Sequence, residues 1–122
     1  MLQDELGKKI LFFDGGMGTL LQEQGLMPGE LPENWNVDKK DIIQTIHRKY
    51  YEAGSNIILT NTFGANRMKY HDEQYSLQEI INAAVDNVKI AAPNAMVALD
   101  VGPTGKLLKP LGDLAFEEAY RV

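Results

Sequence analysis

The sequence predicts an α/β fold, namely the N-terminal portion of a (β/α)8 TIM barrel with about three βα units and part of a fourth helix. Short apolar runs alternate with amphipathic stretches, which is typical of parallel βαβ units with right-handed crossovers. The runs recur at intervals of roughly 40 residues and end in polar residues and glycines, as at the rim of a barrel that carries active sites. A doubly wound open sheet is the main alternative.

Composition describes one globular domain spanning residues 1–122. The 122 residues are 44% hydrophobic and 24% charged, with a formal net charge of −5, which suits a chain that buries a core. The acidic balance does not favour nucleic acid or an anionic membrane as partner. No apolar run approaches the roughly 18 residues of a membrane span, and no signal peptide begins the chain. We therefore expect a cytoplasmic protein.

The first part of the chain predicts a strand, a short helix and a loop. Residues 9–14 form an apolar run that leads into glycines, typical of a strand buried on both faces. Residues 19–24 suit a short helix with Thr19 as its cap and Gly25 as its end. Residues 27–37 contain two prolines and a glycine and are expected to be a loop.

A second helix and strand come next. Apolar side chains recur at helical spacing in residues 41–53, where Gly54 ends the pattern. The residues of this apolar face are Ile42, Ile46, Tyr50 and Ala53. Residues 56–61 then predict the second strand.

The third helix has the clearest signature. Ser76 and Glu79 fit a capping box, in which each side chain satisfies a backbone donor of the first turn. An apolar stripe runs from Leu77 to Ala92, and Pro93 ends it. Its other members are Ile80, Ile81, Ala84, Val85 and Val88.

Residues 96–100 predict the third strand, and Asp113 is expected to cap a fourth helix that continues to Val122. The three expected strands end at Asp14, Asn61 and Asp100. Because the carboxyl ends of parallel strands meet at one rim, these polar residues are candidates for a common site.

The turn after the first strand is the most informative motif. Three glycines fall within residues 15–18 and let backbone amides approach a ligand that a Cβ would keep away. Neither the Rossmann fingerprint nor the P-loop fits, since Leu21 stands where the last glycine belongs and no Gly-Lys-Ser/Thr follows. The amides of Gly15 and Gly16 beside Asp14 could hold a zwitterion. A tight turn with glycines for steric reasons alone is an equal alternative.

Polar side chains also follow the second and third strands. Thr60, Asn61 and Thr62 leave the second strand with more polarity than a buried strand end usually carries without partners. Alternation places the two threonines on one face and Asn61 on the other. Satisfying loop backbone is the alternative role for all three. For Asp100, a capping or turn carboxylate is weighed slightly above contact with a ligand.

The remaining candidates carry weaker signals. His47 is expected on a solvated face of the second helix, beside Arg48, and His71 in a polar loop. The two histidines are far apart and the chain has no cysteine, so its own residues predict no metal site. Trp35 is either an aromatic wall over the barrel mouth or packing that pins the loop.

The ordered set of motifs resembles the start of the homocysteine S-methyltransferase family. The resemblance rests on the glycine turn after Asp14, on residues 47–48 and 53–56, on residues 59–65, and on residues 102–105 with 110–112. It is closest to the homocysteine-binding module of cobalamin-dependent enzymes. The betaine-dependent branch tends to carry an aromatic residue where Gly64 stands, so Gly64 argues mildly against that branch.

The resemblance implies a methyltransferase that converts homocysteine to methionine. It implies a zinc ion held by three cysteines from later strands, methylcobalamin as the methyl donor, and cobalamin-binding and folate-binding modules as partners. Zinc lowers the pKa of the thiol, so that a thiolate can attack the methyl group. Transferred residue by residue, Asp14, Gly15 and Gly16 hold the amino acid end of homocysteine and Thr60 contacts its carboxylate. Weaker candidates for substrate binding are Asn61, Thr62 and Asp100.

The length of the chain sets limits on this function. A complete barrel needs about 250 residues, so we expect an N-terminal fragment without zinc, without catalytic residues of its own and without activity alone. Exposed sheet edges predict self-association. A methyltransferase that uses betaine, S-methylmethionine or S-adenosylmethionine, or a non-catalytic α/β binding or interaction domain, remains the alternative.

Overall fold

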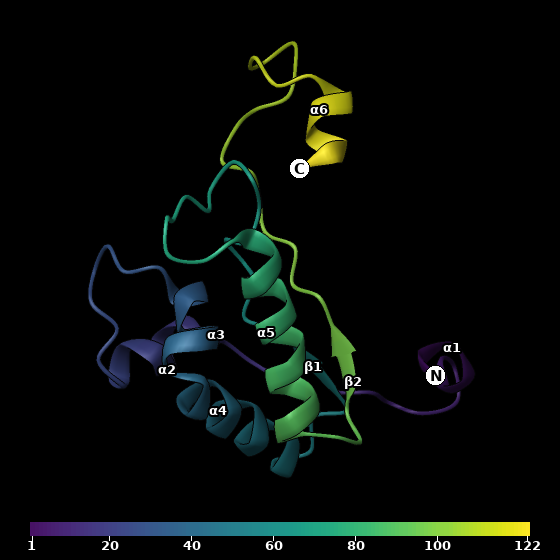
Figure 1. Ribbon diagram of the computed structural model, residues 1–122. Coiled ribbons are helices and arrows are strands. Elements are labelled where there is room, and N and C mark those ends of the chain that lie inside the picture. The colour runs from purple at the N-terminus through teal and green to yellow at the C-terminus, as the bar shows by residue number, and fades with distance from the viewer.

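The computed structural model describes residues 1–122 and contains a parallel βαβ unit. Strand β1 (Ile57–Leu59) pairs with strand β2 (Met96–Ala98), with Ile57 opposite Met96. Helix α5 (Leu77–Ala91) makes the connection between them (Figure 1). The mixed α/β fold and the parallel pairing expected from the sequence are therefore confirmed, with both strands shorter than expected, while closure into a barrel stays a prediction.

The sequence predicts a buried strand at residues 9–14, and this prediction is wrong in two respects. Only Phe13 forms a bridge, parallel to Ile57, next to a hydrogen bond of 3.0 Å from the Asp14 amide to the Ile57 carbonyl. Phe12 and Phe13 are 59% and 57% exposed. The segment pairs with β1 on one side only and nothing in the chain covers its other side, so its apolar side chains stay in solvent. Its direction still places Asp14 at the carboxyl end of β1.

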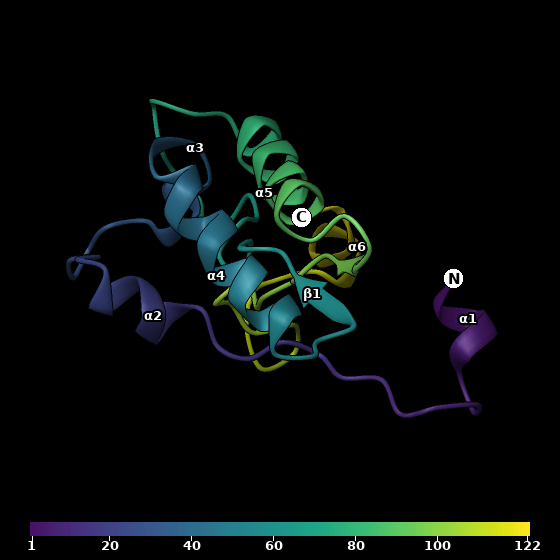
Figure 2. The same ribbon diagram turned by 90° about the horizontal axis from the view of Figure 1, so that it is seen from below.

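Two long helices cover one face of the sheet. Helix α4 (Lys40–Glu52) packs against α5 and β1, and Figures 1 and 2 show both helices on the same side of the strands. Both helices lie within one residue of the expected bounds. The capping box of α5 is confirmed, because Ser76 Oγ accepts from the Glu79 amide at 3.2 Å and Glu79 Oε2 accepts from the Ser76 amide at 2.7 Å.

The other elements are short. They are α1 (Leu2–Glu5), α2 (Gly18–Glu23), the 3-10 helix η1 (Pro32–Asn34), α3 (Trp35–Asp38) and α6 (Phe116–Arg121). Helix α1 lies apart from the packed helices in both views (Figures 1 and 2), and α6 lies beyond them in Figure 1. None of the helices combines the length and the apolar character that a passage through a membrane requires.

Two expected helix caps are wrong. Met17, and not Thr19, is the N-cap of α2, and Ala115, and not Asp113, is the N-cap of α6; neither of these caps makes a side-chain hydrogen bond. A Ser, Thr, Asp or Asn near a helix start is a local signal that fixes the first residue of a helix only to within one or two positions. The expected glycine stop of α2 is confirmed, since Gly25 has φ +102°.

The expected loop 27–37 also needs correction, because it contains η1 and the start of α3. Trp35 is 4% exposed and packs in a core cluster with Leu21, Ile43 and Ile46. Burial of this large ring stabilises the helical turns η1 and α3. The polar residues and prolines around Trp35 had instead predicted a loop. Of the two roles considered for Trp35, the structure shows packing.

His47 is a buried core residue, and its expected place on a solvated helix face is wrong. It lies on α4 with no exposed surface, and neither ring nitrogen has a hydrogen-bond partner. Burial lowers the pKa of His47 to about 4, since the imidazolium would lose its hydration without gaining a partner. Arg48 and Lys49 beside it in the sequence are exposed, which is why the local composition suggested a solvated face.

His47 predicts a loss of stability in mild acid. The folded protein holds this ring neutral down to about pH 4, whereas the unfolded chain takes up a proton near pH 6.5, so unfolding binds a proton and becomes easier as pH falls. Between pH 7 and pH 5 this group alone should remove about 2 kcal/mol from the free energy of unfolding. Urea titrations should show this loss disappear in His47→Leu and persist in His71→Gln, which alters an exposed ring. An identical pH dependence in His47→Leu would contradict the assignment.

Candidate functional site

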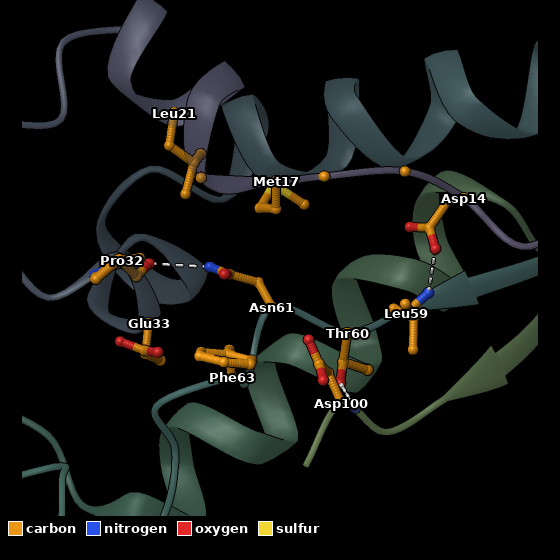
Figure 3. A pocket seen from close by; sticks show the side chains of 13 residues that line it. Asp14, Met17, Leu21, Pro32, Glu33, Leu59, Thr60, Asn61, Phe63 and Asp100 are labelled. Atoms are coloured by element: carbon orange, nitrogen blue, oxygen red, sulfur yellow. Dashed lines mark hydrogen bonds between the residues drawn. The ribbon is translucent and has the colours of Figure 1, made fainter. Parts of the chain in front are cut away.

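The carboxyl ends of segment 9–14, β1 and β2 meet at a cavity of about 580 Å³, which lies within the range of small-molecule sites. The loop that contains η1 closes another side (Figure 3). Of the residues expected at a site, this cavity brings together Asp14, Gly15, Gly16, Thr60, Asn61 and Asp100. Lining residues that were not named as substrate-binding candidates are Met17, Gly18, Leu21, Pro32, Glu33, Leu59 and Phe63.

Asp14 is held at the cavity wall by β1. Its Oδ1 accepts a hydrogen bond of 3.1 Å from the Leu59 amide, as the dashed line in Figure 3 shows. Burial raises the pKa of Asp14, and the nearby charge of Asp100 also raises it. Hydrogen bonds from the backbone amides of Leu59 and of Asp14 itself act in the opposite direction and lower the pKa, but the net shift is upward. A cationic group that enters the cavity would relieve both the desolvation and the repulsion.

The glycine turn that borders the same cavity has backbone amides without a hydrogen-bond partner. The backbone N–H groups of Gly15, Gly16 and Met17 donate no hydrogen bond within the protein. Gly15 and Gly16 are exposed and line the cavity. Unpaired amides beside a carboxylate form a site for a group that carries both charges, because the N–H dipoles attract an anion and Asp14 attracts a cation.

Thr60, Thr62 and Asp100 form a closed ring of hydrogen bonds. Thr62 donates to the Asp100 carbonyl at 2.7 Å, so its single hydroxyl hydrogen is used, and Thr60 must be the donor in their 2.7 Å contact. The Asp100 amide completes the ring by donating to Thr60 Oγ1 at 3.2 Å. The hydroxyl of Thr60 therefore has no hydrogen left for a ligand in this conformation. Thr62 does not line the cavity.

Asn61 lies on the opposite side of the strand end, as alternation predicts, and joins a buried amide network. Its Nδ2 donates to the Pro32 carbonyl at 2.9 Å and to Asn36 Oδ1 at 3.0 Å. Asn36 Nδ2 returns a bond of 2.9 Å to the Asn61 carbonyl. Asn87 Nδ2 on α5 donates to the Asn36 carbonyl, also at 2.9 Å. The network fastens the loop that contains η1 to β1 and α5.

Glu33 is the cavity residue that sequence reasoning missed most clearly. It is 5% exposed, and its Oε1 accepts from the Gly64 amide at 2.7 Å. A Cβ on Gly64 would lie 2.6 Å from the same oxygen, so the glycine permits the contact. A glutamate in a polar loop usually points to solvent. The one local signal against a plain loop is Pro32, since proline favours the first position of a helical turn.

The titratable residues of the chain do not form a metal centre. No group of three His, Cys, Asp or Glu side chains is placed to hold a metal ion. His47 is enclosed in the core, and His71 is exposed, with its Nε2 3.1 Å from the Met68 carbonyl.

Comparison with protein families gives a match over most of the chain. The model of the family described as homocysteine S-methyltransferase matches residues 11–122. Among curated proteins, methionine synthase of Mycobacterium leprae is 38% identical over 71 residues, which cover 53% of this chain and 6% of that protein. Methionine synthase of Mycobacterium tuberculosis is 39% identical with the same coverage. The chain thus spans a small part of the length of these relatives.

Solved structures show a similar arrangement. The metallated form of the homocysteine methyltransferase MmuM from Escherichia coli has a TM-score of 0.66 at 25% identity, covering 85% of this chain and 42% of that protein. The oxidized form has a TM-score of 0.69 at 25% identity, covering 85% and 41%. The chain spans less than half of either structure.

The close approach at Gly102 predicts that a side chain at this position destabilises the protein. A Cβ there would lie 1.9 Å from the Phe63 carbonyl oxygen, so Gly102→Ala must separate two backbone segments that border the site. We expect a loss of about 1–3 kcal/mol in the free energy of unfolding. Gly18→Ala is the matched control, because no atom lies within 4 Å of the position that its Cβ would take. Chemical denaturation of both variants measures the difference, and equal stabilities would contradict the close approach.

Proposed function

Because the chain belongs to the homocysteine S-methyltransferase family, we propose that its cavity binds homocysteine. The observation that carries the proposal is the set of unpaired amides of Gly15, Gly16 and Met17 beside Asp14 on one wall of the cavity. Homocysteine has an α-carboxylate and an α-ammonium on one carbon, so it presents an anion and a cation side by side. The wall offers a partner of opposite sign for each.

The proposed pose follows from these charges. The amides of the glycine turn receive the carboxylate, and Asp14 receives the ammonium as an ionised acceptor. Thr60 and Thr62 support the pose through the ring that joins the strand ends, and a direct contact of Thr60 with the carboxylate requires that ring to open. Asn61 and Asp100 border the cavity. The thiol then extends away from the glycine turn.

The proposed reaction is transfer of a methyl group to the homocysteine sulfur, which gives methionine. Relatives named methionine synthase support the methionine-synthase type, with methylcobalamin as donor and with cobalamin-binding and folate-binding modules in the whole protein. The E. coli relative, named a homocysteine methyltransferase, keeps open a donor such as betaine, S-methylmethionine or S-adenosylmethionine. A cytoplasmic location is part of the proposal.

The proposed zinc ion does not fit the residues of this chain. The chain has no cysteine and no group of three side chains suited to a metal ion. Its ligands are therefore proposed to be the three cysteines of later strands that the family resemblance implies. Residues 1–122 are proposed to bind the amino acid end of the substrate. That they are inactive in methyl transfer when alone stays a prediction.

Substitution of Asp14 tests the proposed function. Asp14→Asn keeps the shape and an acceptor for the Leu59 amide but removes the charge that meets the ammonium. We expect the dissociation constant for homocysteine, measured by calorimetry, to rise roughly ten- to one-hundredfold. Asp4→Asn, at an exposed position of α1, should leave it unchanged. Absence of homocysteine binding by the unaltered chain would refute the proposal.

Binding should also depend on pH through Asp14. The carboxylate must be ionised to receive the ammonium, so affinity falls as pH drops through its pKa. Because burial raises that pKa, the loss should begin at a higher pH than for an exposed aspartate. Calorimetry across the acidic range should show this dependence in the unaltered chain and its absence in Asp14→Asn.

Exposed apolar side chains around the sheet support the proposal of self-association. Strand β2 is an edge strand, and Leu99 just beyond it is 51% exposed; such edges recruit other chains. Light scattering should give a mass above that of the monomer, rising with concentration. Leu99→Lys should lower it, whereas Leu111→Lys, at an 87% exposed loop position, should not. A constant monomer mass at every concentration would contradict this.

A further inference from the structure

Tyr50 contacts the glycine turn from the side away from the cavity. Its hydroxyl, on α4, donates a hydrogen bond of 2.7 Å to the Gly16 carbonyl. Gly15 and Gly16 line the proposed homocysteine cavity, but Tyr50 does not; it borders a separate depression between α2 and α4. The turn therefore separates Tyr50 from the ligand.

This hydrogen bond fixes the direction of an amide that faces the cavity. The only cis peptide bond in the chain is Lys109–Pro110, so the peptide between Gly16 and Met17 is trans. In a trans peptide the C=O and N–H bonds point in opposite directions. Since Tyr50 draws the Gly16 carbonyl toward α4, the Met17 N–H points away from α4, toward the cavity that Met17 lines.

The ring of Tyr50 also contacts Gly15, the residue before Gly16 in the turn. A Cβ on Gly15 would lie 2.9 Å from Tyr50 Oη and 3.1 Å from Cε1, so the glycine backbone rests on the edge of the ring. Glycines allow a peptide plane to rotate with little steric resistance. A rotated Gly16–Met17 peptide would turn its carbonyl into the cavity, where it would repel a carboxylate.

We propose that Tyr50 is a positioning residue that holds the glycine turn with its amides directed at the α-carboxylate of the amino acid ligand. The inference rests on the proposed function and deepens it, because it explains how a flexible turn keeps one orientation. Tyr50 acts through the turn and touches no substrate. Its contribution therefore depends on whether the ligand carries a carboxylate.

The test compares two ligands in one variant. Tyr50→Phe keeps the ring against Gly15 and removes the hydroxyl. The ligands are homocysteine and 3-aminopropanethiol, which has the same thiol and ammonium but no carboxylate. We expect Tyr50→Phe to raise the dissociation constant for homocysteine roughly three- to tenfold, the effect of one neutral hydrogen bond, and to leave that for 3-aminopropanethiol unchanged. Tyr51→Phe, which removes the same hydroxyl one residue along α4, should alter neither.

The Met17 amide gives a direct readout by NMR. Its resonance should shift on addition of homocysteine to the unaltered chain, shift less in Tyr50→Phe, and stay in place with 3-aminopropanethiol. Equal weakening of both ligands in Tyr50→Phe would show a general structural role and overturn the inference, as would unchanged binding of both. Failure of the unaltered chain to bind homocysteine would instead overturn the proposed function itself, before any variant is compared.

Discussion

The geometry of the cavity depends on the hydrogen-bonded ring that closes the carboxyl ends of β1 and β2. Both strands have only three residues, too few for the ladder alone to hold the loops that leave them. The ring of Thr60, Thr62 and Asp100 continues the pairing beyond the last strand residues through side chains. It joins the two strand ends through two hydroxyl groups and the backbone amide and carbonyl of Asp100, polar groups whose burial would otherwise be unfavourable.

The amide network around Asn61 extends this connection to the opposite wall. Asn36 exchanges hydrogen bonds with Asn61 through both its side-chain oxygen and nitrogen, and Asn87 fixes its backbone. The loop that contains η1 is thereby attached to β1 and α5 at once, and this attachment places Glu33 over Gly64. A network of this kind is satisfied as a whole, so loss of one amide leaves others unpaired at a cost above that of one hydrogen bond.

The positions of the two long helices were predictable from neighbours in the sequence, whereas the caps of α2 and α6 and the contacts between distant residues were not. The apolar periodicity of α4 and the capping box at Ser76 are local, so helix positions could be predicted from sequence within one residue. The convergence of Asp14, Asn61 and Asp100 was expected because the carboxyl ends of parallel segments meet at one rim. No local pattern indicates that His47 turns inward beside exposed cations, or that Tyr50 reaches a turn 34 positions earlier. Such contacts arise only when α4 packs across the sheet.

Electrostatics explains why the glycine turn is central to the site. The cavity is bordered by three carboxylates, Asp14, Glu33 and Asp100, and by no lysine or arginine. A ligand with only an anionic group would meet repulsion with no compensating cation, whereas a zwitterion brings its own ammonium to the carboxylates. Its carboxylate must then be received by backbone dipoles, and the free amides of the turn are the donors that the wall provides. The orientation of those amides is therefore the feature on which recognition of an amino acid, rather than a simple amine, depends.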